Sequence, residues 1–224
     1  MKESQAREEI CRVGKSLFDR AYVHASAGNI SVRLDEAQGG GFLITPTDAC
    51  LGFLDPARLA RLDAAGVQLS GDRASKTITL HTQIYQAALR FQPATRCVIH
   101  THSTHCVALS LRSPLQELLP PLTPYFVMKV GRVPLIDYHR PGSVEAAEKV
   151  RQVIETYGAA GRPVRAVMLA RLGPNVWHDS PAAAMATLEE LEETARLHLL
   201  GGAATEVLSA AQIEDLRKTF GAVW

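Results

Sequence analysis

The two histidines of the segment Cys97-Val98-Ile99-His100-Thr101-His102 are the side chains of this chain best suited to chemistry. They follow an apolar run and are separated by one residue, and on an extended strand two such positions point to the same face. His100 and His102 can therefore aim at one point, as two ligands of a zinc ion do. A catalytic zinc takes three protein ligands and keeps one position open. The alternative is that one histidine packs in the core while the other lies on the surface.

Three polar turns offer further groups for a small ligand. They are Gly28-Asn29, Thr47-Asp48 and Ser75-Lys76, each at the end of an expected strand or helix. The turn Ser75-Lys76 precedes a helix, whose free N–H groups and dipole favour an anion. With their one lysine, the three turns together would form a cradle for a phosphate. Taken singly, each has the composition of an ordinary turn or cap.

Short strands and helices must position these groups. Helical spacing of apolar residues predicts helices over 4–20, 80–88, 104–110, 143–154 and from Ser180 to Gly201-Gly202, with a last helix opened by a capping box of Ser209 and Gln212. Strands are expected over 30–34, 42–45, 59–62, 67–69, 125–130, 133–136, 167–170 and 175–177, and in the segment that carries the two histidines. Strands in hairpin-like pairs between helices indicate an α+β layered fold with a largely antiparallel sheet.

Composition narrows the class of protein. With 224 residues and no linker-like stretch, the chain is expected to form one domain, residues 1–224. A formal net charge of +1 without a basic stripe argues against a nucleic-acid partner. No apolar run approaches the ~20 residues that span a bilayer, and no secretory signal is visible, so no membrane role is expected. The cysteines lack CxxC spacing, and we expect free thiols in a reducing cytoplasm.

Eight short motifs follow one another in a distinctive order. They are Ser26-Ala27-Gly28-Asn29-Ile30-Ser31, Thr45-Pro46-Thr47, Ser75-Lys76, His100-Thr101-His102-Ser103-Thr104, Thr123-Pro124-Tyr125, Tyr138-His139-Arg140-Pro141-Gly142, Gly173-Pro174 and Leu188-Glu189-Glu190-Leu191-Glu192-Glu193-Thr194-Ala195. In this order and spacing the chain resembles the class II aldolase/adducin family over nearly its whole length. The resemblance is closest to the 3-oxo-tetronate 4-phosphate decarboxylase branch and more distant to L-fuculose-phosphate aldolase.

The resemblance implies an architecture and a set of site residues. The fold would be a three-layer α/β/α sandwich with a central, largely antiparallel sheet, assembled as a homotetramer with active sites between subunits. His100 and His102 would bind a divalent metal, usually zinc, and Tyr125 would reach into a neighbouring subunit's site as an acid. The substrate-binding residues, at the places where relatives hold a phosphate, would be Gly28, Asn29, Thr47, Asp48, Ser75 and Lys76.

The function implied by the resemblance is that of a metal-dependent carbon–carbon lyase, an aldolase or a decarboxylase, acting on a small sugar acid or sugar phosphate. In such chemistry the metal is an electron sink for an enediolate, and a tyrosine hydroxyl moves a proton at carbon. In the decarboxylase, carbon dioxide leaves a four-carbon 3-oxo acid phosphate and the product is dihydroxyacetone phosphate.

Three positions depart from the family pattern. Thr77 stands where the family has its acid/base glutamate, Leu172 where it has a third metal-binding histidine, and Asp48 where it has a glycine. Two imidazoles alone would hold zinc with an affinity lower by orders of magnitude, and threonine cannot shuttle a proton near neutral pH. A carboxylate ~4 Å from a phosphate dianion would repel it by a few kcal/mol.

Two explanations of these departures stay open. In one, the protein is a lyase on a related acid, with Asp48 as the replacement carboxylate and His105, His139 or His178 as a surrogate metal ligand. In the other, it is a small-ligand-binding or regulatory relative that kept the scaffold and lost turnover, as the adducin head domain is understood to have done.

Overall fold

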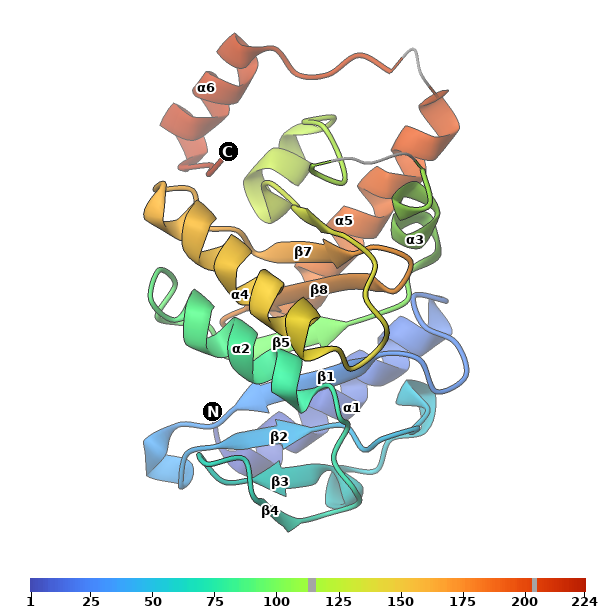
Figure 1. The fold of residues 1–224 in the computed structure, drawn as a ribbon, viewed down its shortest axis with the longest axis vertical. Helices are drawn as coiled ribbons and strands as arrows, with labels where there is room; N and C mark the ends of the chain where they lie inside the picture. Colours follow the sequence, from blue (N-terminus) through green and yellow to red (C-terminus); the bar gives the residue numbers. More distant parts are fainter. Residues whose placement is uncertain (113–115, 203–204) are drawn as a thin grey trace.

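A single mixed sheet runs through the centre of the computed structural model, which describes residues 1–112, 116–202 and 205–224 (Figure 1). In these residues the sheet has eight strands in the order β4-β3-β2-β1-β5-β8-β7-β6, and every neighbouring pair is antiparallel except β6 and β7. The strands are β1 (Asn29–Arg33), β2 (Phe42–Ile44), β3 (Ala60–Leu62), β4 (Gln68–Ser70), β5 (Cys97–His100), β6 (Leu135–Ile136), β7 (Ala166–Leu169) and β8 (Gly173–His178). The expected largely antiparallel sheet is thus confirmed.

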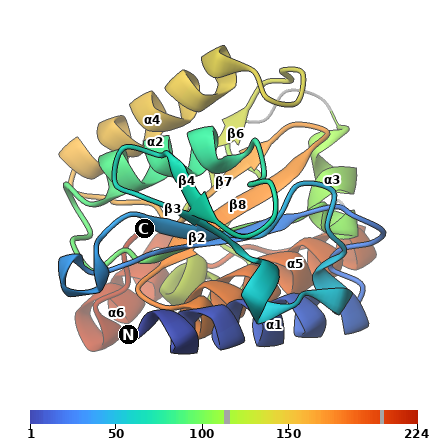
Figure 2. The ribbon, with the colours of Figure 1, turned by 90° about the horizontal axis from the view of Figure 1, so that it is seen from below.

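Helices cover both faces of the sheet, so the expected three layers are also confirmed. Figure 2 shows α2 and α4 on one face and α1 and α5 on the other. The helices are α1 (Glu3–Asp19), α2 (Ile78–Ala88), α3 (Thr104–Ser110), α4 (Val144–Ala159), α5 (Pro181–Gly201) and α6 (Ala210–Phe220). Short helical turns are η1 (Glu36–Gln38), η2 (Leu51–Phe53), η3 (Pro56–Arg58) and η4 (Phe126–Val130). No helix of these described ranges is long and apolar enough to cross a lipid bilayer.

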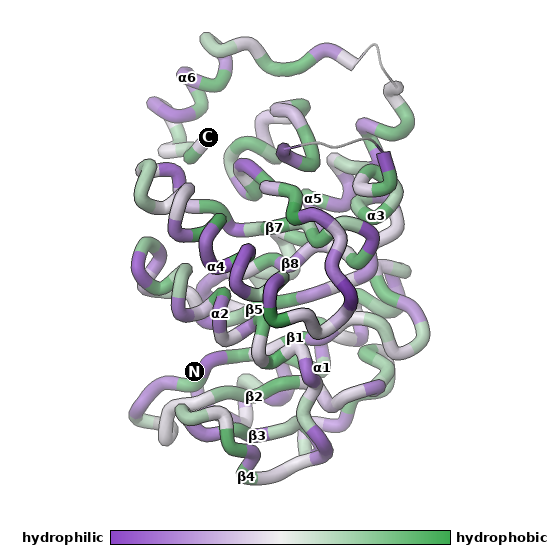
Figure 3. The backbone as a smooth tube through the Cα atoms, in the orientation of Figure 1, coloured by the Kyte–Doolittle hydropathy of each residue, from purple (hydrophilic) through white to green (hydrophobic). Residues whose placement is uncertain are grey.

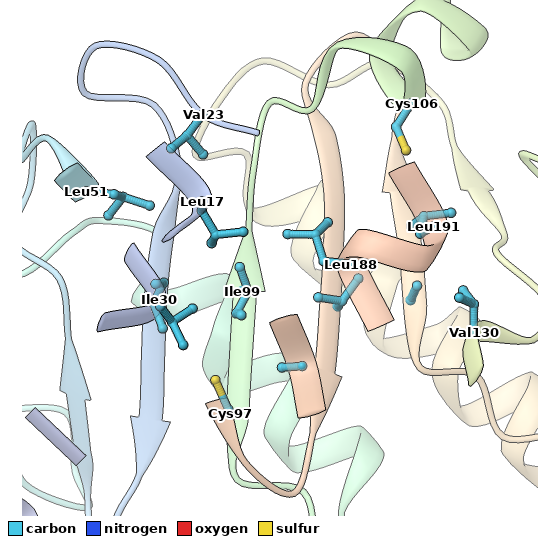
Figure 4. Packing of buried hydrophobic residues seen from close by; sticks show 14 of the residues in the cluster. Leu17, Val23, Ile30, Leu51, Cys97, Ile99, Cys106, Val130, Leu188 and Leu191 are labelled. Carbon is cyan, nitrogen blue, oxygen red and sulfur yellow. The ribbon is translucent and has the colours of Figure 1, made fainter. Parts of the chain in front are cut away.

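The alternation of side chains along β5 divides the core between the two faces. Ile99 packs with Leu17 of α1 and Leu188 of α5 in one buried cluster, shown in Figure 4. Val98 belongs to a second cluster, with residues of α2 and α4. Figure 3 shows that hydrophilic and hydrophobic residues alternate along α4, as expected for a helix with one face on the core. Val150 and Ile154 of α4 are buried. Because His100 has the parity of Val98, its side chain lies on the α2 and α4 face of the sheet.

The predicted helix starts are mostly confirmed by their caps. Ser143 accepts a hydrogen bond from the backbone N–H of Ala146, Ser180 caps α5 in the same way, and Ser209 with Gln212 forms the capping box of α6. Each cap satisfies an N–H group that has no partner inside its helix. The helix predicted over 143–154 continues to Ala159, because residues 155–157 include no glycine or proline and Gly158 is accommodated in the last turn.

Two strand predictions are wrong. The stretch predicted as a strand over 125–130 forms a π-helical turn, η4, which packs against α5. Its buried residues Phe126, Val127 and Val130 follow a helical spacing, and tertiary packing overrides the strand preference of an apolar, β-branched run. The strand expected to carry both histidines ends at His100, so His102 lies in the connection to α3.

Candidate active site

One pocket gathers all the phosphate-site and metal-site residues expected from the sequence. It has a volume of about 310 Å³ and lies where β2 and β5 end and β1 and α2 begin, and Pro141, Gly142 and Leu172 also line it. The expected residues that line it are Gly28, Asn29, Thr47, Asp48, Ser75, Lys76, His100 and His102. Tyr125 does not line it and is 63% exposed elsewhere on the chain.

His100 is a buried imidazole whose hydrogen bond sets its tautomer. Its Nδ1 lies 3.0 Å from the backbone oxygen of Pro174, and because a carbonyl only accepts, Nδ1 donates and Nε2 keeps a free lone pair. Burial, and to a smaller degree the nearby His102, lowers the pKa of His100 to about 4, although the Pro174 contact acts in the opposite direction. His100 is therefore neutral near pH 7, in the form that binds a metal.

The rings of His100 and His102 have the spacing of two ligands of one metal ion. Their centroids are 5.1 Å apart and their planes are inclined at 68°. A metal about 2 Å from a nitrogen of each ring, at a tetrahedral angle, puts the ring centres about 5 Å apart. Burial, followed by the nearby His24, lowers the pKa of His102. Two neutral imidazoles at this spacing are compatible with a divalent metal, although no group of three His, Cys, Asp or Glu side chains in the described ranges is arranged to hold one.

Two glycines let neighbouring loops approach this histidine pair. Gly28 has φ +85°, and a Cβ there would lie 2.9 Å from the backbone oxygen of His100. Gly173 has φ +140°, and a Cβ there would lie 1.9 Å from the backbone oxygen of Thr101. Both positions need the conformational range and the missing side chain of glycine. The motifs Ser26–Ser31 and Gly173-Pro174 thus shape the walls on either side of His100.

A buried polar row continues from His100 across the sheet. In the strand register His100 faces Asn29 of β1 and Asn175 of β8. Asn29 donates its side-chain amide to the hydroxyl of Thr77 at 3.2 Å, whereas both amide atoms of Asn175 are buried without a partner in the described chain. Asn175 was not among the expected site residues, because a single asparagine with no second polar residue at a regular spacing does not mark a site in the sequence.

His81 of α2 extends this polar row. Its Nδ1 lies 2.7 Å from the hydroxyl of Ser31, while its Nε2 is buried without a partner in the described residues. Complete burial, and secondarily the nearby His100, lowers the pKa of His81 to about 3. His81 is therefore neutral at physiological pH and lies buried behind the residues that line the pocket.

The expected phosphate turns form one end of the pocket. The Ser75 hydroxyl accepts from the backbone N–H of Thr77 at 3.4 Å, and α2 begins at the next residue, Ile78. Asp48 has φ +57°, in the left-handed region that favours glycine but tolerates aspartate. The backbone at Asp48 therefore has a glycine-like shape, consistent with the glycine that the family pattern has there.

The surrogate ligands considered from the sequence are not beside the histidine pair. His105 bonds through Nδ1 to the buried Glu192 at 2.8 Å, and His178 is opposite Cys97, at the far end of β5 from His100. His139 does not line the pocket. The histidine near His102 is instead His24, whose ring centroid is 6.4 Å away. Sequence spacing gave no signal for His24, which precedes the pair by more than seventy positions.

Fold and pocket together define a protein of the class II aldolase type: the chain belongs to the Class II Aldolase and Adducin N-terminal domain family, whose model matches residues 8–199. It is 49% identical over 229 aligned positions to the 3-oxo-tetronate 4-phosphate decarboxylase of Cupriavidus necator, with 99% of each chain covered. The crystal structure of YgbL from Escherichia coli has a TM-score of 0.85 at 39% identity, covering 96% of this chain and 99% of YgbL. An L-fuculose 1-phosphate aldolase structure shares the fold at 23% identity, with a TM-score of 0.80 and 97% and 96% of the two chains covered.

Proposed function

We propose that this protein is a divalent-metal-dependent carboxy-lyase acting on a small 3-oxo sugar-acid phosphate, most like 3-oxo-tetronate 4-phosphate. The observation that carries the proposal is the 5.1 Å spacing of the His100 and His102 rings in a pocket that also contains Lys76. The relative at 49% identity bears the name of this activity. The metal is proposed to be zinc, since neutral imidazoles suit it.

The reaction needs an electron sink and a proton. The bond between the carboxylate carbon and C2 breaks, carbon dioxide leaves, and the electron pair moves toward the C3 ketone. A proton then adds at C2 and gives dihydroxyacetone phosphate. A divalent metal bound by His100 and His102 would polarise the ketone and stabilise the developing negative charge.

The replacement at Thr77 favours decarboxylation over aldol cleavage. Aldol cleavage requires a base to remove the hydroxyl proton of the departing aldehyde, and a carboxylate suits that role. A substrate carboxylate is already ionised near neutral pH and needs no such base to leave as carbon dioxide. Thr77 instead accepts the hydrogen bond from Asn29. The loss of the glutamate therefore removes a base that aldol cleavage requires and that decarboxylation does not.

The substrate phosphate is proposed to bind at the start of α2. Lys76 supplies a positive charge, and the first N–H groups of the eleven-residue helix α2 point toward this end. Asn29 and Thr47 add polar side chains to the same pocket. The negative charge of Asp48 repels a phosphate dianion. We therefore expect a weaker affinity for phosphate than a glycine at that position would allow.

Tyr125 is proposed to act on a neighbouring subunit of a homotetramer. Its side chain is 63% exposed and lies outside its own chain's pocket, next to the η4 turn. A phenol at the pocket of an adjacent chain would be able to deliver the proton to C2. This role requires an assembly, because a monomer would leave the pocket without a proton donor of this kind.

The activity is tested with purified protein, 3-oxo-tetronate 4-phosphate and a chelator-treated sample. We expect release of carbon dioxide and formation of dihydroxyacetone phosphate, loss of both after metal removal, and recovery with zinc. The matched variants are His100→Ala, which should abolish turnover, and His178→Ala at the far end of the sheet, which should not. Metal uptake without any turnover on this acid or related acids would instead support the second candidate function, a ligand-binding protein, which the changes at Thr77 and Leu172 favour.

A further inference from the structure

His24 lies on the loop between α1 and β1, beside the histidine pair. Its ring centroid is 6.4 Å from that of His102, and the two planes are inclined at 74°. Its side chain is exposed and makes no hydrogen bond or ion pair with the described part of the chain. His24 is therefore an imidazole without a hydrogen bond or ion pair in the described residues, beside one of the two proposed metal ligands.

The backbone on both sides of His24 is held in place. Val23, the preceding residue, is buried in the core with Leu17 and Leu51, and Figure 4 shows the three side chains together. The backbone N–H of Tyr22 donates to the backbone oxygen of Leu17 at 2.9 Å. The backbone oxygen of His24 accepts from the backbone N–H of Ala27 at 2.9 Å. This anchoring fixes the position of the His24 Cα and leaves the imidazole free to turn.

Leu172 stands at the position where the family pattern has a third metal-binding histidine. Its side chain lines the same pocket as His100 and His102 but has no atom that binds a metal. Ligands of one tetrahedral ion need ring centres about 5 Å apart, so His24 must approach His102 by about 1 Å and must also come to about 5 Å from His100. Rotation about the side-chain bonds of an exposed histidine covers such a distance on a picosecond to nanosecond timescale.

We propose that His24, His100 and His102 together form a three-imidazole site for a divalent transition metal, in which His24 replaces the ligand that is missing at Leu172. This inference rests on the metal dependence of the proposed function. It assigns a ligand set of three imidazole nitrogens, which suits zinc, cobalt and nickel better than magnesium or calcium. The fourth coordination position stays open for a substrate oxygen, as a catalytic site requires.

The test measures metal affinity and coordination, independently of turnover. Metal-free protein is titrated with Zn²⁺ alone by calorimetry and with Co²⁺ alone by visible absorption, which reports the coordination geometry. The variants are His24→Ala, His100→Ala and the control His178→Ala, which removes an imidazole at the other end of β5. Because His24 is exposed, its replacement should leave the fold intact, and circular dichroism checks this.

We expect one zinc per chain in the wild-type protein and in His178→Ala. His24→Ala should weaken zinc binding by at least about 100-fold, since even changes in residues that only orient a ligand cost 10–100-fold. It should also change the cobalt spectrum. The double variant His24→Ala with Leu172→His should regain zinc affinity, because Leu172 lines the same pocket as His100 and His102 and its replacement supplies a third imidazole there.

Two results would overturn the inference, and they differ in what they mean for the proposed function. If His24→Ala binds zinc with wild-type affinity while His100→Ala does not, His24 is no ligand and the metal-dependent lyase still stands. Asp48→Asn then tests whether that carboxylate is the third ligand. If the wild-type protein takes up neither Zn²⁺ nor Co²⁺ at micromolar concentration, the three-histidine site and the metal-dependent function both fall.

Discussion

The side-chain amide of Asn29 donates a hydrogen bond to the hydroxyl of Thr77 at 3.2 Å, at the start of α2. This contact ties the strand β1 to the position where the family pattern has a glutamate. Thr77 is the residue directly before α2, so its side chain also lies beside the proposed phosphate site. The chain thus uses this position for a neutral hydrogen bond, with consequences for the proton transfers that it can catalyse.

Introducing a carboxylate by Thr77→Glu should place a general base at this end of the pocket. We expect the carbon-bound protons next to the ketone of dihydroxyacetone phosphate to exchange with D₂O faster, by roughly 10²–10⁴-fold. Proton NMR follows the exchange directly. Thr77→Gln, which has the same shape without a base, is the matched control. Equal exchange rates in the two variants would show that this position does not reach the reacting carbon.

Replacing Asp48 by glycine should strengthen the binding of phosphorylated ligands. The carboxylate lies in the same pocket as Lys76, and its backbone is already left-handed, at φ +57°, so glycine fits without strain. Removal of the like charge should tighten binding of dihydroxyacetone phosphate by about 10-fold or more, measured by calorimetry. Asp48→Asn removes the charge but keeps the shape and should have most of the effect. An unchanged affinity in both variants would mean that the carboxylate points away from the phosphate.

The stability of the metal-free protein should fall as the pH falls below about 6.5, the pKa of a histidine in an unfolded chain. His81 is neutral in the folded state because its pKa is lowered to about 3 by burial, whereas in the unfolded state it takes up a proton. Acid therefore favours unfolding, and His81 alone should lower the free energy of unfolding by about 2 kcal/mol between pH 8 and pH 5. His100, with a pKa of about 4, acts in the same direction.

Urea denaturation across this pH range, with a chelator present, measures the effect. His81→Gln removes one of the histidines whose pKa is lowered in the folded state, so its free energy of unfolding should depend less steeply on pH than that of the wild-type protein. The variant will also lose stability at every pH, since the contact with Ser31 is broken. Only the slope is therefore diagnostic, and an identical slope would show that His81 does not titrate between the two states.

The role of Tyr125 across a subunit boundary can be tested by mixing two inactive proteins. Tyr125→Phe lacks the proposed acid and His100→Ala lacks a proposed metal ligand, so each protein on its own should be inactive. After the two are unfolded and refolded together, about one quarter of the sites at random pair a wild-type Tyr125 with a wild-type His100 from the adjacent chain. Activity near a quarter of the wild-type level is expected. The mixed protein should have the same molecular mass as the wild-type protein. If it has that mass but no activity, Tyr125 and His100 do not complement each other between chains.

Local patterns in the sequence determined much of the fold. The starts of α4, α5 and α6 follow from their caps, and the β1–β2 hairpin from the turn before Phe42. These features depend on neighbours a few residues away, so the sequence carries them directly. The run 125–130 was interpreted as a strand because its composition suits one, whereas its packing against α5 makes it a helical turn.

The sequence by itself also determined which residues are equipped for chemistry: an apolar run into two histidines, and polar turns at the ends of elements. Only the tertiary structure decided which other residues lie beside them, because residues far apart in the chain meet through strand register and loop packing. Register sets Asn29 and Asn175 on either side of His100. The burial of Val23 beside Leu51 brings His24 toward His102, and the exposure of Tyr125 keeps it out of its own pocket.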